Sequence, residues 1–476
     1  MSYYRMSELV SRRRLLSTCG ALGIGSLAGC SGLLGSEESN GSWPMTGYGP
    51  GNTAFNPSAS GPKDSLSEAW SVSAGDLRSD AGVEQHLTPH VSPPVVADGS
   101  IFVASWEGIS GREFSTACHL HKIADDGEIA WSSDPLTSTV IVAERPVSLA
   151  VVSGTVYVVA PDADHETGLW ALDAESGDIL WEHEKYALGD PIVRDGEVIV
   201  QGNTDIGTVY ATSTDGSHAW TFSATTADGD VVPADGTGAA DGERTYVPMY
   251  GGGIVAVDGS GERDWYTDEF LTDQSDERAA LRSIVAGDSI YASVGMITVS
   301  DGKLVALDPT DGSVRWEFKP DFDAERRQTA LENVPAGYNP GGLHLGVYGK
   351  PALADGTVYM FGYELTESDL GEWWHKDTPE YMVPKFYALS ADSGDVEWTV
   401  PLDGLYPGMF PIVADGTIYL SVAGEEEGQL LAIDADSGDI IDRMSGYPSV
   451  VTGVAVAGER LYVSEFSGDL LAIGPT

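Results

Sequence analysis

The chain has 476 residues, enough for a large hydrophobic core, and carries 73 Asp and Glu against 25 Lys and Arg, a formal net charge of −48. The acidic residues are scattered along the sequence, and a surface of this charge repels phosphate backbones, which excludes nucleic-acid binding. The composition indicates a solvated, halophilic surface adapted to multimolar salt. At such salt concentrations the repulsion between the acidic side chains is screened to within about 3 Å. A specific cationic partner is the alternative explanation.

The N-terminus is predicted to be a targeting segment. The run Ser11-Arg-Arg-Arg-Leu-Leu16, with Arg12 and Arg13 as its arginine pair, has the form of a twin-arginine export signal. The weakly hydrophobic stretch 15–29 is too short to cross a bilayer of about 30 Å as a helix. It ends in Leu27-Ala-Gly-Cys30, which resembles a lipoprotein box. We therefore expect 1–29 to be a signal peptide and Cys30 to be lipidated; a cleaved signal with an incidental cysteine is the alternative.

The expected location is the outer side of the cytoplasmic membrane, with the protein held there by its lipid. Twin-arginine export carries folded proteins, which suits either a fast-folding protein or one loaded with a cofactor before export. Residues 30–42 are polar and read as a flexible tether. The folded body is expected to span 43–476.

One pattern recurs through this body. A turn such as Ser153-Gly154 or Asp195-Gly196 precedes an apolar run, and a sequence of the Leu-x-Ala-Leu-Asp kind follows. Each copy then ends in Gly-x-x-x-Trp, as in Gly177 and Trp181. A period of about 40–50 residues with four strand signals per copy is typical of a β-propeller.

The copies delimit eight blades, at 91–131, 145–181, 189–220, 231–265, 281–316, 349–398, 408–442 and 451–473. The last copy lacks its outer strand, whereas 66–72 is a lone outer strand that carries Trp70. The sequence therefore predicts an all-β, eight-bladed β-propeller of four-stranded antiparallel blades, closed by an N-terminal strand that completes the last blade.

The repeat tryptophans are expected to be structural, packed between neighbouring blades. They are Trp70, Trp131, Trp181, Trp220, Trp265, Trp316 and Trp398. In the seventh copy Asp442 stands where a tryptophan is expected, which we interpret as a degenerate repeat with looser packing.

The Leu-x-Ala-Leu-Asp-like strand, the glycine turn and the terminal tryptophan resemble the quinoprotein (PQQ-type) β-propeller repeat. Trp43 and Asn52-Thr53 also resemble the opening segment of that family, so the resemblance covers about residues 43–476. It implies two classes of function. One is the alcohol and sugar dehydrogenases that bind pyrroloquinoline quinone and calcium. The other is non-catalytic propellers, such as the lipid-anchored propeller of the outer-membrane barrel-assembly machine.

The sequence departs from the dehydrogenases in several ways. It has neither the vicinal cysteine pair of the large alcohol dehydrogenases nor a Cys-x-x-Cys-His haem attachment sequence. No residue can be matched to their calcium-binding Glu/Asn pair or catalytic Asp. We therefore expect a non-catalytic scaffold or binding protein without cofactor, metal or catalytic residues. A quinoprotein dehydrogenase with quinone and calcium is the alternative.

Long insertions are expected on one face of the propeller. The segments 105–117, 132–144, 266–280, 320–348 and 361–384 fall between second and third strands or between blades, and these connections leave a propeller on the same side. Loops on a rigid scaffold often bind partners. Aromatic and histidine residues from this face form a candidate surface for a protein partner, although they could instead pack together and cap the channel. They are Trp373, Trp374, His375, Tyr381, Tyr338, His344, Tyr348, Trp106 and Tyr406.

His119 and His121 are predicted to lie on one side of a strand, with Cys118 on the other. A metal site would need a third ligand, so we interpret them as ordinary histidines of a strand face. Cys19 lies in the signal peptide and Cys30 would carry the lipid, so Cys118 is the one cysteine left in the folded body. An intramolecular disulfide is therefore excluded, and we expect Cys118 to be a small buried apolar residue.

Overall fold

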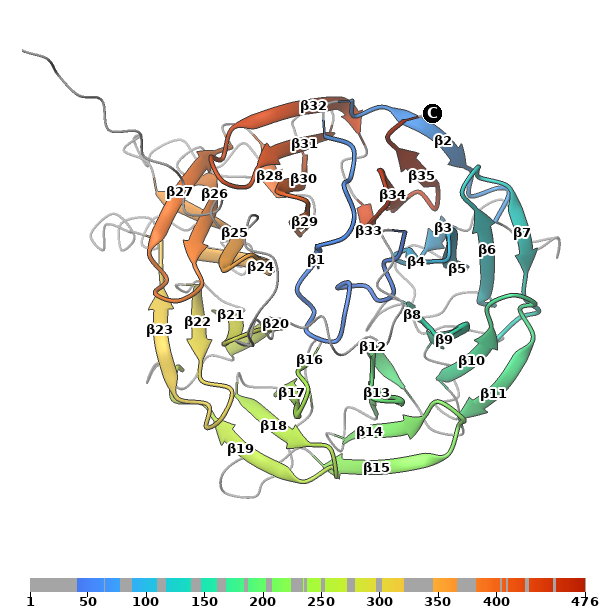
Figure 1. The fold of residues 1–476 in the computed structure, drawn as a ribbon, viewed down its shortest axis with the longest axis horizontal. Helices are drawn as coiled ribbons and strands as arrows, with labels where there is room; N and C mark the ends of the chain where they lie inside the picture. The colour runs from blue at the N-terminus through green and yellow to red at the C-terminus, as the bar shows by residue number, and fades with distance from the viewer. Residues whose placement is uncertain are drawn as a thin grey trace, which may run out of the picture.

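The described part of the chain forms a ring of eight antiparallel sheets around a central channel (Figure 1). The structure is a computed structural model and describes residues 41–63, 65–77, 88–108, 117–137, 147–160, 168–183, 187–202, 208–223, 234, 238–249, 253–271, 279–296, 302–320, 346–365, 382–402, 405–407, 410–423, 428–447 and 451–475. Within these ranges no helix has the length and apolar character needed to cross a bilayer. The predicted eight-bladed β-propeller is confirmed.

The first four blades occupy the right and lower parts of the ring in Figure 1. Blade 1 comprises β3 (Thr88–Val91), β4 (Val95–Ala97), β5 (Ser100–Gly108), β6 (His119–Ala124) and β7 (Ile129–Ser132). Blade 2 comprises β8 (Ser148–Val152), β9 (Thr155–Val159), β10 (Leu169–Asp173) and β11 (Ile179–His183). Blade 3 comprises β12 (Leu188–Arg194), β13 (Glu197–Gln201), β14 (Thr208–Ser213) and β15 (His218–Ser223). Blade 4 comprises β16 (Ala239–Ala240), β17 (Arg244–Pro248), β18 (Ile254–Asp258) and β19 (Arg263–Thr267).

The remaining four blades complete the ring. Blade 5 comprises β20 (Ala279–Ala286), β21 (Ile290–Met296), β22 (Lys303–Leu307) and β23 (Val314–Phe318). Blade 6 comprises β24 (Gly346–Ala354), β25 (Thr357–Leu365), β26 (Met382–Ser390) and β27 (Val396–Pro401). Blade 7 comprises β28 (Tyr406–Pro407), β29 (Ile412–Ala414), β30 (Thr417–Ala423), β31 (Gly428–Asp434) and β32 (Ile440–Tyr447), with β1 (Phe55–Asn56) paired to β29. Blade 8 comprises β33 (Val451–Ala457), β34 (Arg460–Glu465), β35 (Leu470–Ile473) and β2 (Glu68–Val72).

Tight turns join the first and second strands of most blades. Asp98, Ser153, Asp195, Asp355 and Asp415 have φ between 41° and 51°, and the glycine after each has φ between 70° and 80°. Two successive residues of positive φ define the type I′ hairpin turn, which explains the recurring Asp-Gly and Ser-Gly pairs.

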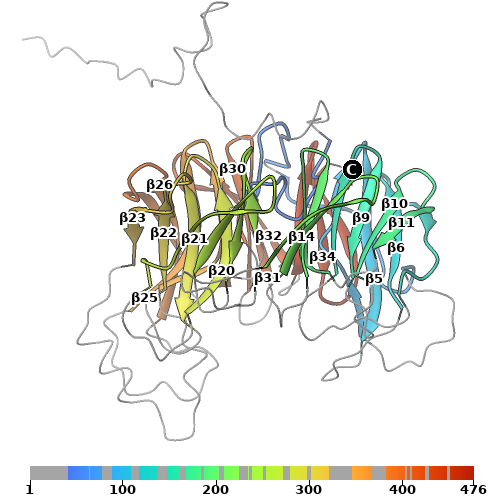
Figure 2. The ribbon, with the colours of Figure 1, turned by 90° about the horizontal axis from the view of Figure 1, so that it is seen from below.

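The two ends of the blades differ. These tight turns lie at one end, which we call the turn face. The second-to-third connections and the blade-to-blade connections leave from the other end, where the ends of β5 and β25 lie in Figure 2; we call it the loop face.

The hydrophobic core lies between blades. Each of the seven buried apolar clusters among the described residues joins neighbouring blades, for example β5 and β6 of blade 1 with β8 and β9 of blade 2. The middle strands are therefore buried on both faces, whereas outer strands are partly solvated: Leu180 of β11 is 54% exposed. Buried β-branched and aromatic residues on both sheet faces favour these strands.

The structure explains why glycine and tryptophan recur together. In blades 1 to 7 the glycine before the outer strand lies against the tryptophan of the preceding blade, and a Cβ at that glycine would come within 2.6–3.0 Å of the tryptophan side chain. The contacts are Gly127–Trp70, Gly177–Trp131, Gly216–Trp181, Gly261–Trp220, Gly312–Trp265, Gly394–Trp316 and Gly438–Trp398. These glycines also have φ of 74–89°, a region that costs other residues energy. The repeat tryptophans are therefore interblade contacts, as predicted.

The ring closes as the sequence predicts, because β2 pairs with β35 and places Trp70 opposite Ala472. The exception at Asp442 has a specific cause. The chain leaves the channel between blades 7 and 8 on its way to β2 (Figure 1), and the Asp442 carboxylate accepts a hydrogen bond from Leu66 N at 2.8 Å. Tyr419 Oη also donates to Pro62 O, at 3.3 Å. Asp442 thus binds the segment that passes between blades 7 and 8. The sequence alone predicts only looser packing at this position.

Candidate functional site

Residues 42–60, here called the plug, run across the channel at the turn face; they include β1 in Figure 1. Backbone hydrogen bonds of 2.7–2.9 Å join the plug to the inner strands of six blades, between Trp43 and Val96, Pro44 and Val151, Pro50 and Ala240, Gly51 and Ala286, Thr53 and Leu353, and Ala54 and Val413. A seventh blade is reached by Asn56 Nδ2, which donates to Val456 O at 2.9 Å. The plug therefore closes the channel at this face.

The plug has an unusual backbone conformation, with positive φ at several residues other than glycine. Tyr48, Asn52 and Ala54 all have positive φ, at 76°, 57° and 53°. Gly47 lies so close to Asn52 that a Cβ there would come within 1.9 Å of the Asn52 Oδ1. Unusual φ values persist only where surrounding contacts hold them, and here the hydrogen bonds to the blades do so.

A cavity of about 90 Å³ lies beneath the plug. Plug residues Thr46, Asn52 and Ala54 line it together with inner-strand residues of several blades. The other lining residues are Asp190, Ser283, Lys350, Phe410, Ile412, Thr452, Gly453 and Val454. The cavity is thus formed by segments that are remote in sequence.

Lys350 of β24 is the cation of this cavity and is only 8% exposed. Its Nζ donates to Asn52 Oδ1, and Asn52 Nδ2 donates to Ile284 O at 3.0 Å. Burial lowers the pKa of Lys350 to about 8, although the Asp190 carboxylate acts in the opposite direction. Asp190 Oδ1 in turn accepts a hydrogen bond from Ser148 Oγ at 2.5 Å. A buried ammonium and a carboxylate therefore face the same central cavity.

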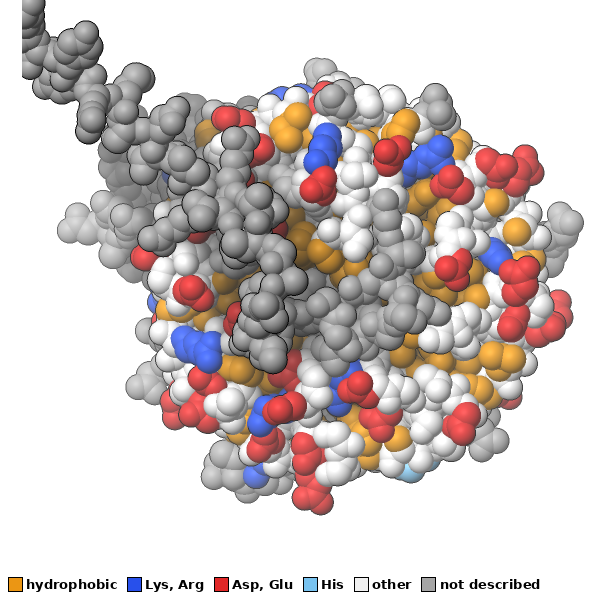
Figure 3. Space-filling view, viewed as in Figure 1, with side chains coloured by type: hydrophobic (Ala, Val, Ile, Leu, Met, Phe, Trp, Pro, Cys, Tyr) orange, Lys and Arg blue, Asp and Glu red, His pale blue; other side chains and the backbone are white. Residues whose placement is uncertain are grey.

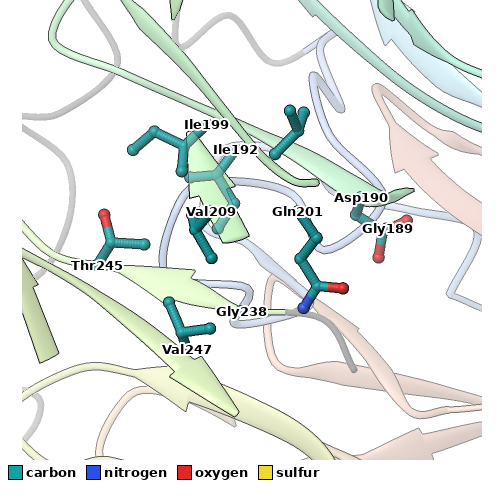
Figure 4. Close-up of a pocket in the computed structure, with 10 residues that line it drawn as sticks. Gly189, Asp190, Ile192, Ile199, Gln201, Val209, Gly238, Thr245 and Val247 are labelled. Atoms are coloured by element: carbon teal, nitrogen blue, oxygen red, sulfur yellow. The ribbon is translucent and has the colours of Figure 1, made fainter. Parts of the chain in front are cut away.

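A second, smaller cavity of about 20 Å³ lies between blades 3 and 4 (Figure 4). Its walls are mostly apolar, with Ile192, Ile199, Val209 and Val247 facing one another. Asp190 lines it too, and so reaches both cavities. The volume suits one or two water molecules, which makes it a packing feature of the interblade layer.

The histidine pair predicted to be structural is hydrogen-bonded within blade 1. His121 is 2% exposed and contacts Ser105 Oγ and Ser132 Oγ, both at 2.7 Å. Burial, aided by the nearby His119, lowers the pKa of His121 to about 4, so the ring is neutral at pH 7. Cys118 is buried, as expected, and burial raises the pKa of its thiol to about 12, which makes it unreactive.

The sequence matches a family model described as outer membrane protein assembly factor BamB, in overlapping segments at 65–190, 119–267, 226–364 and 349–476. The chain belongs to this family. No curated protein matches the sequence.

Solved structures extend the similarity of fold. Quinohemoprotein alcohol dehydrogenase from Comamonas testosteroni aligns with a TM-score of 0.60 at 15% identity, over 91% of this chain and 81% of that one. A europium-containing methanol dehydrogenase aligns with a TM-score of 0.61 at 15% identity, over 89% of each chain. BamB from Moraxella catarrhalis aligns with a TM-score of 0.50 at 16% identity, over 86% of this chain and 98% of that one.

Among the described residues, the cavity beneath the plug is small for a quinone cofactor. A fused tricyclic quinone with several carboxylates needs a pocket in the range of about 300–1,000 Å³ typical of larger ligands, and the cavity has about 90 Å³. Among the described residues there is no group of three or more His, Cys, Asp or Glu that could hold a metal ion. Among the described residues that line the cavity, Lys350 is the one cation.

Most residues of the candidate aromatic face lie outside the described residues: Trp373, Trp374, His375, Tyr381, Tyr338 and His344. Tyr348 and Tyr406 are placed by backbone pairing, opposite Phe361 and Ala423. Trp106 differs from the expectation, since it is 5% exposed and stacks on His90 with ring centroids 5.6 Å apart. Strand alternation directs this indole into the layer between blades 1 and 2 and not onto a surface.

Sequence reasoning missed the central cluster. Asn52 was noted only as part of the opening segment, and neither Lys350 nor Asp190 was singled out. The one available signal was Lys350 itself, a charged residue between Gly349 and Pro351 in the inner strand β24. Only the ring topology brings it to the channel axis.

Proposed function

We propose that this chain is a non-catalytic scaffold or binding protein, lipid-anchored on the outer side of the cytoplasmic membrane. The observation that carries the proposal is the plug. It bonds to seven of the eight blades, and the cavity beneath it has a volume of about 90 Å³, small for a quinone. We propose that the chain binds neither quinone nor metal, and that it binds its partner through the insertion-rich loop face.

The charge of the surface argues against a nucleic-acid partner. Figure 3 shows Asp and Glu side chains spread over the rim of the turn face, with isolated Lys and Arg among them. Several of these cations are paired, as in Lys63–Asp415 and Arg460–Asp125. A surface of this kind stays soluble in high salt and repels polyanions.

The family supports a protein partner and an extracytoplasmic location. Its description names an outer-membrane protein assembly factor, which acts with other proteins. The twin-arginine motif at Arg12 and Arg13 supports export, and Leu27-Ala-Gly-Cys30 supports the lipid. Together they support a partner protein at the cell surface.

Reconstitution with pyrroloquinoline quinone and calcium tests this function against the dehydrogenase alternative. Purified chain incubated with both, then desalted, is expected to retain no quinone absorbance and to reduce no dye with alcohols or sugars. A known quinoprotein alcohol dehydrogenase, treated in the same way, serves as the positive control. One bound quinone per chain with substrate-dependent dye reduction would overturn the proposal in favour of the alternative.

Cys30→Ser is expected to abolish lipidation, because no other side chain at that position can form the thioether. The variant should leave the membrane fraction, or accumulate unprocessed. Cys19→Ser is the matched control, since that cysteine lies inside the signal. Cell fractionation and mass measurement of the mature N-terminus read the result, and unchanged membrane association and mass for Cys30→Ser would refute the anchor.

Trp373→Ala combined with Trp374→Ala is expected to weaken binding to a surface partner by about 2–4 kcal/mol, as hot-spot truncations do. The thermal melting curve should stay unchanged, because neither residue is a repeat tryptophan. Retrieval of cross-linked partners from membrane extract, compared with wild type, measures the effect. A large loss of thermal stability would show that these rings cap the channel, and unchanged retrieval would place the binding surface elsewhere.

A further inference from the structure

The cavity beneath the plug contains polar groups that the fold does not use. Ser283 of β20 is 2% exposed, lines the cavity, and its Oγ has no hydrogen-bond partner in the described structure. Thr46 Oγ1 of the plug lines the same cavity and also lacks a partner there. A buried hydroxyl without a partner is destabilising, and a bound ligand or water that hydrogen-bonds to it would remove that cost.

Lys350 supplies a charge for such a ligand. An ammonium group has three donors, and within the described chain Asn52 Oδ1 accepts from one of them. Desolvation outweighs the attraction of Asp190, since the pKa of Lys350 falls in spite of that carboxylate. The buried cation is thus incompletely compensated, and an anion beside it would be stabilised.

We propose that this cavity binds a small monocarboxylate, whose carboxylate accepts hydrogen bonds from Lys350 Nζ and Ser283 Oγ. Three features define the class. The apolar side chains of Ala54, Ile412 and Val454 provide a wall for a short alkyl end. A single buried cation with Asp190 nearby disfavours dianions such as phosphate. The volume of about 90 Å³ accommodates about six to nine heavy atoms, at about one water-sized probe for each 10–15 Å³.

Calorimetric titration with sodium lactate tests the site, with chloride and ionic strength held constant. Wild-type chain is expected to bind one lactate, and propylene glycol, an uncharged compound with the same carbon skeleton, should give no binding heat. Ser283→Ala should weaken lactate binding about tenfold, the effect of losing one hydrogen bond to a charged group. Thermal stability should be retained, because Ser283 Oγ has no partner in the described structure.

Ser421→Ala is the matched control. Ser421 of β30 is also 2% exposed with an unpartnered Oγ, but it is not among the residues that line this cavity. Its lactate affinity should equal that of wild type. Lys350→Met should abolish binding, and if that variant fails to fold, the comparison of Ser283→Ala with Ser421→Ala decides.

Three results with lactate would overturn the proposal. They are no lactate binding by wild type, equal affinities in Ser283→Ala and wild type, and displacement of lactate by chloride at matched concentration, which would indicate a simple halide site. Binding of propylene glycol as tight as that of lactate would equally contradict a carboxylate site.

Discussion

Trp265→Ala is expected to lower the free energy of unfolding by about 3–5 kcal/mol, the cost of removing a large buried aromatic side chain. Trp265 is 8% exposed, packs against Gly312 of the next blade, and donates from Nε1 to Pro309 O at 2.9 Å. Its ring centroid lies 5.8 Å from that of Tyr246. The substitution therefore opens a void between blades 4 and 5. Equilibrium unfolding in denaturant measures the change.

Leu180→Ala is the control for this prediction, because Leu180 is also apolar and on an outer strand but is 54% exposed. It should shift the unfolding midpoint very little. Gly312→Ala sharpens the test: a Cβ there would lie 2.7 Å from Trp265 Cε3. The two substitutions should be non-additive by about 1 kcal/mol, because removal of the indole relieves the clash. If the two losses of unfolding free energy simply add, the contact between Gly312 and Trp265 is contradicted.

A chain that begins at residue 76 is expected to lose cooperative unfolding or to aggregate. It lacks the plug and β2, so blade 8 loses its outer strand and β35 becomes an exposed edge. It also loses Trp43, which is fully buried, and Trp70, whose Nε1 donates to Asp125 O at 2.8 Å. These losses exceed a net stability of about 5–15 kcal/mol. Denaturant unfolding and size-exclusion chromatography measure the outcome.

A chain that begins at residue 41 is the matched control, since it keeps every described residue. It should unfold like the full-length protein. If the chain from residue 76 stays monomeric and unfolds at the same denaturant concentration, closure of the ring by β2 is wrong.

The repeat could be predicted from the sequence because the residues that define it lie close together in each copy. Type I′ turns demand Asp-Gly or Ser-Gly, and the Gly–Trp contact demands both residues at a fixed offset, so each copy carries its own signature. Strand pairing between β2 and β35 followed from counting strands at the two termini.

The plug and its cavity could not be predicted from the sequence in this way. Asn52, Lys350 and Asp190 come from three distant segments, and only closure of the ring brings them together. Asp442 was misinterpreted for a related reason. A missing tryptophan indicates looser packing when one blade is considered alone, whereas the Leu66 amide that occupies the seam belongs to a segment far earlier in the chain. The burial of Trp106 depends in the same way on a neighbouring blade.

Hydrogen exchange across residues 41–60 tests most directly whether the chain closes its own channel. Plug carbonyls accept hydrogen bonds from the inner strands, which hold the plug in place. The plug amide of Trp43 donates to Val96 O, and those of Asn52 and Ala54 donate to carbonyls within the plug. These amide protons should therefore exchange as slowly as those of β9 and β13 in the middle of blades 2 and 3. Mass spectrometry of peptides from this region gives the rates. Exchange as fast as in an isolated peptide of the same sequence, with the blades still protected, would contradict a plugged channel and remove the support for a non-catalytic propeller.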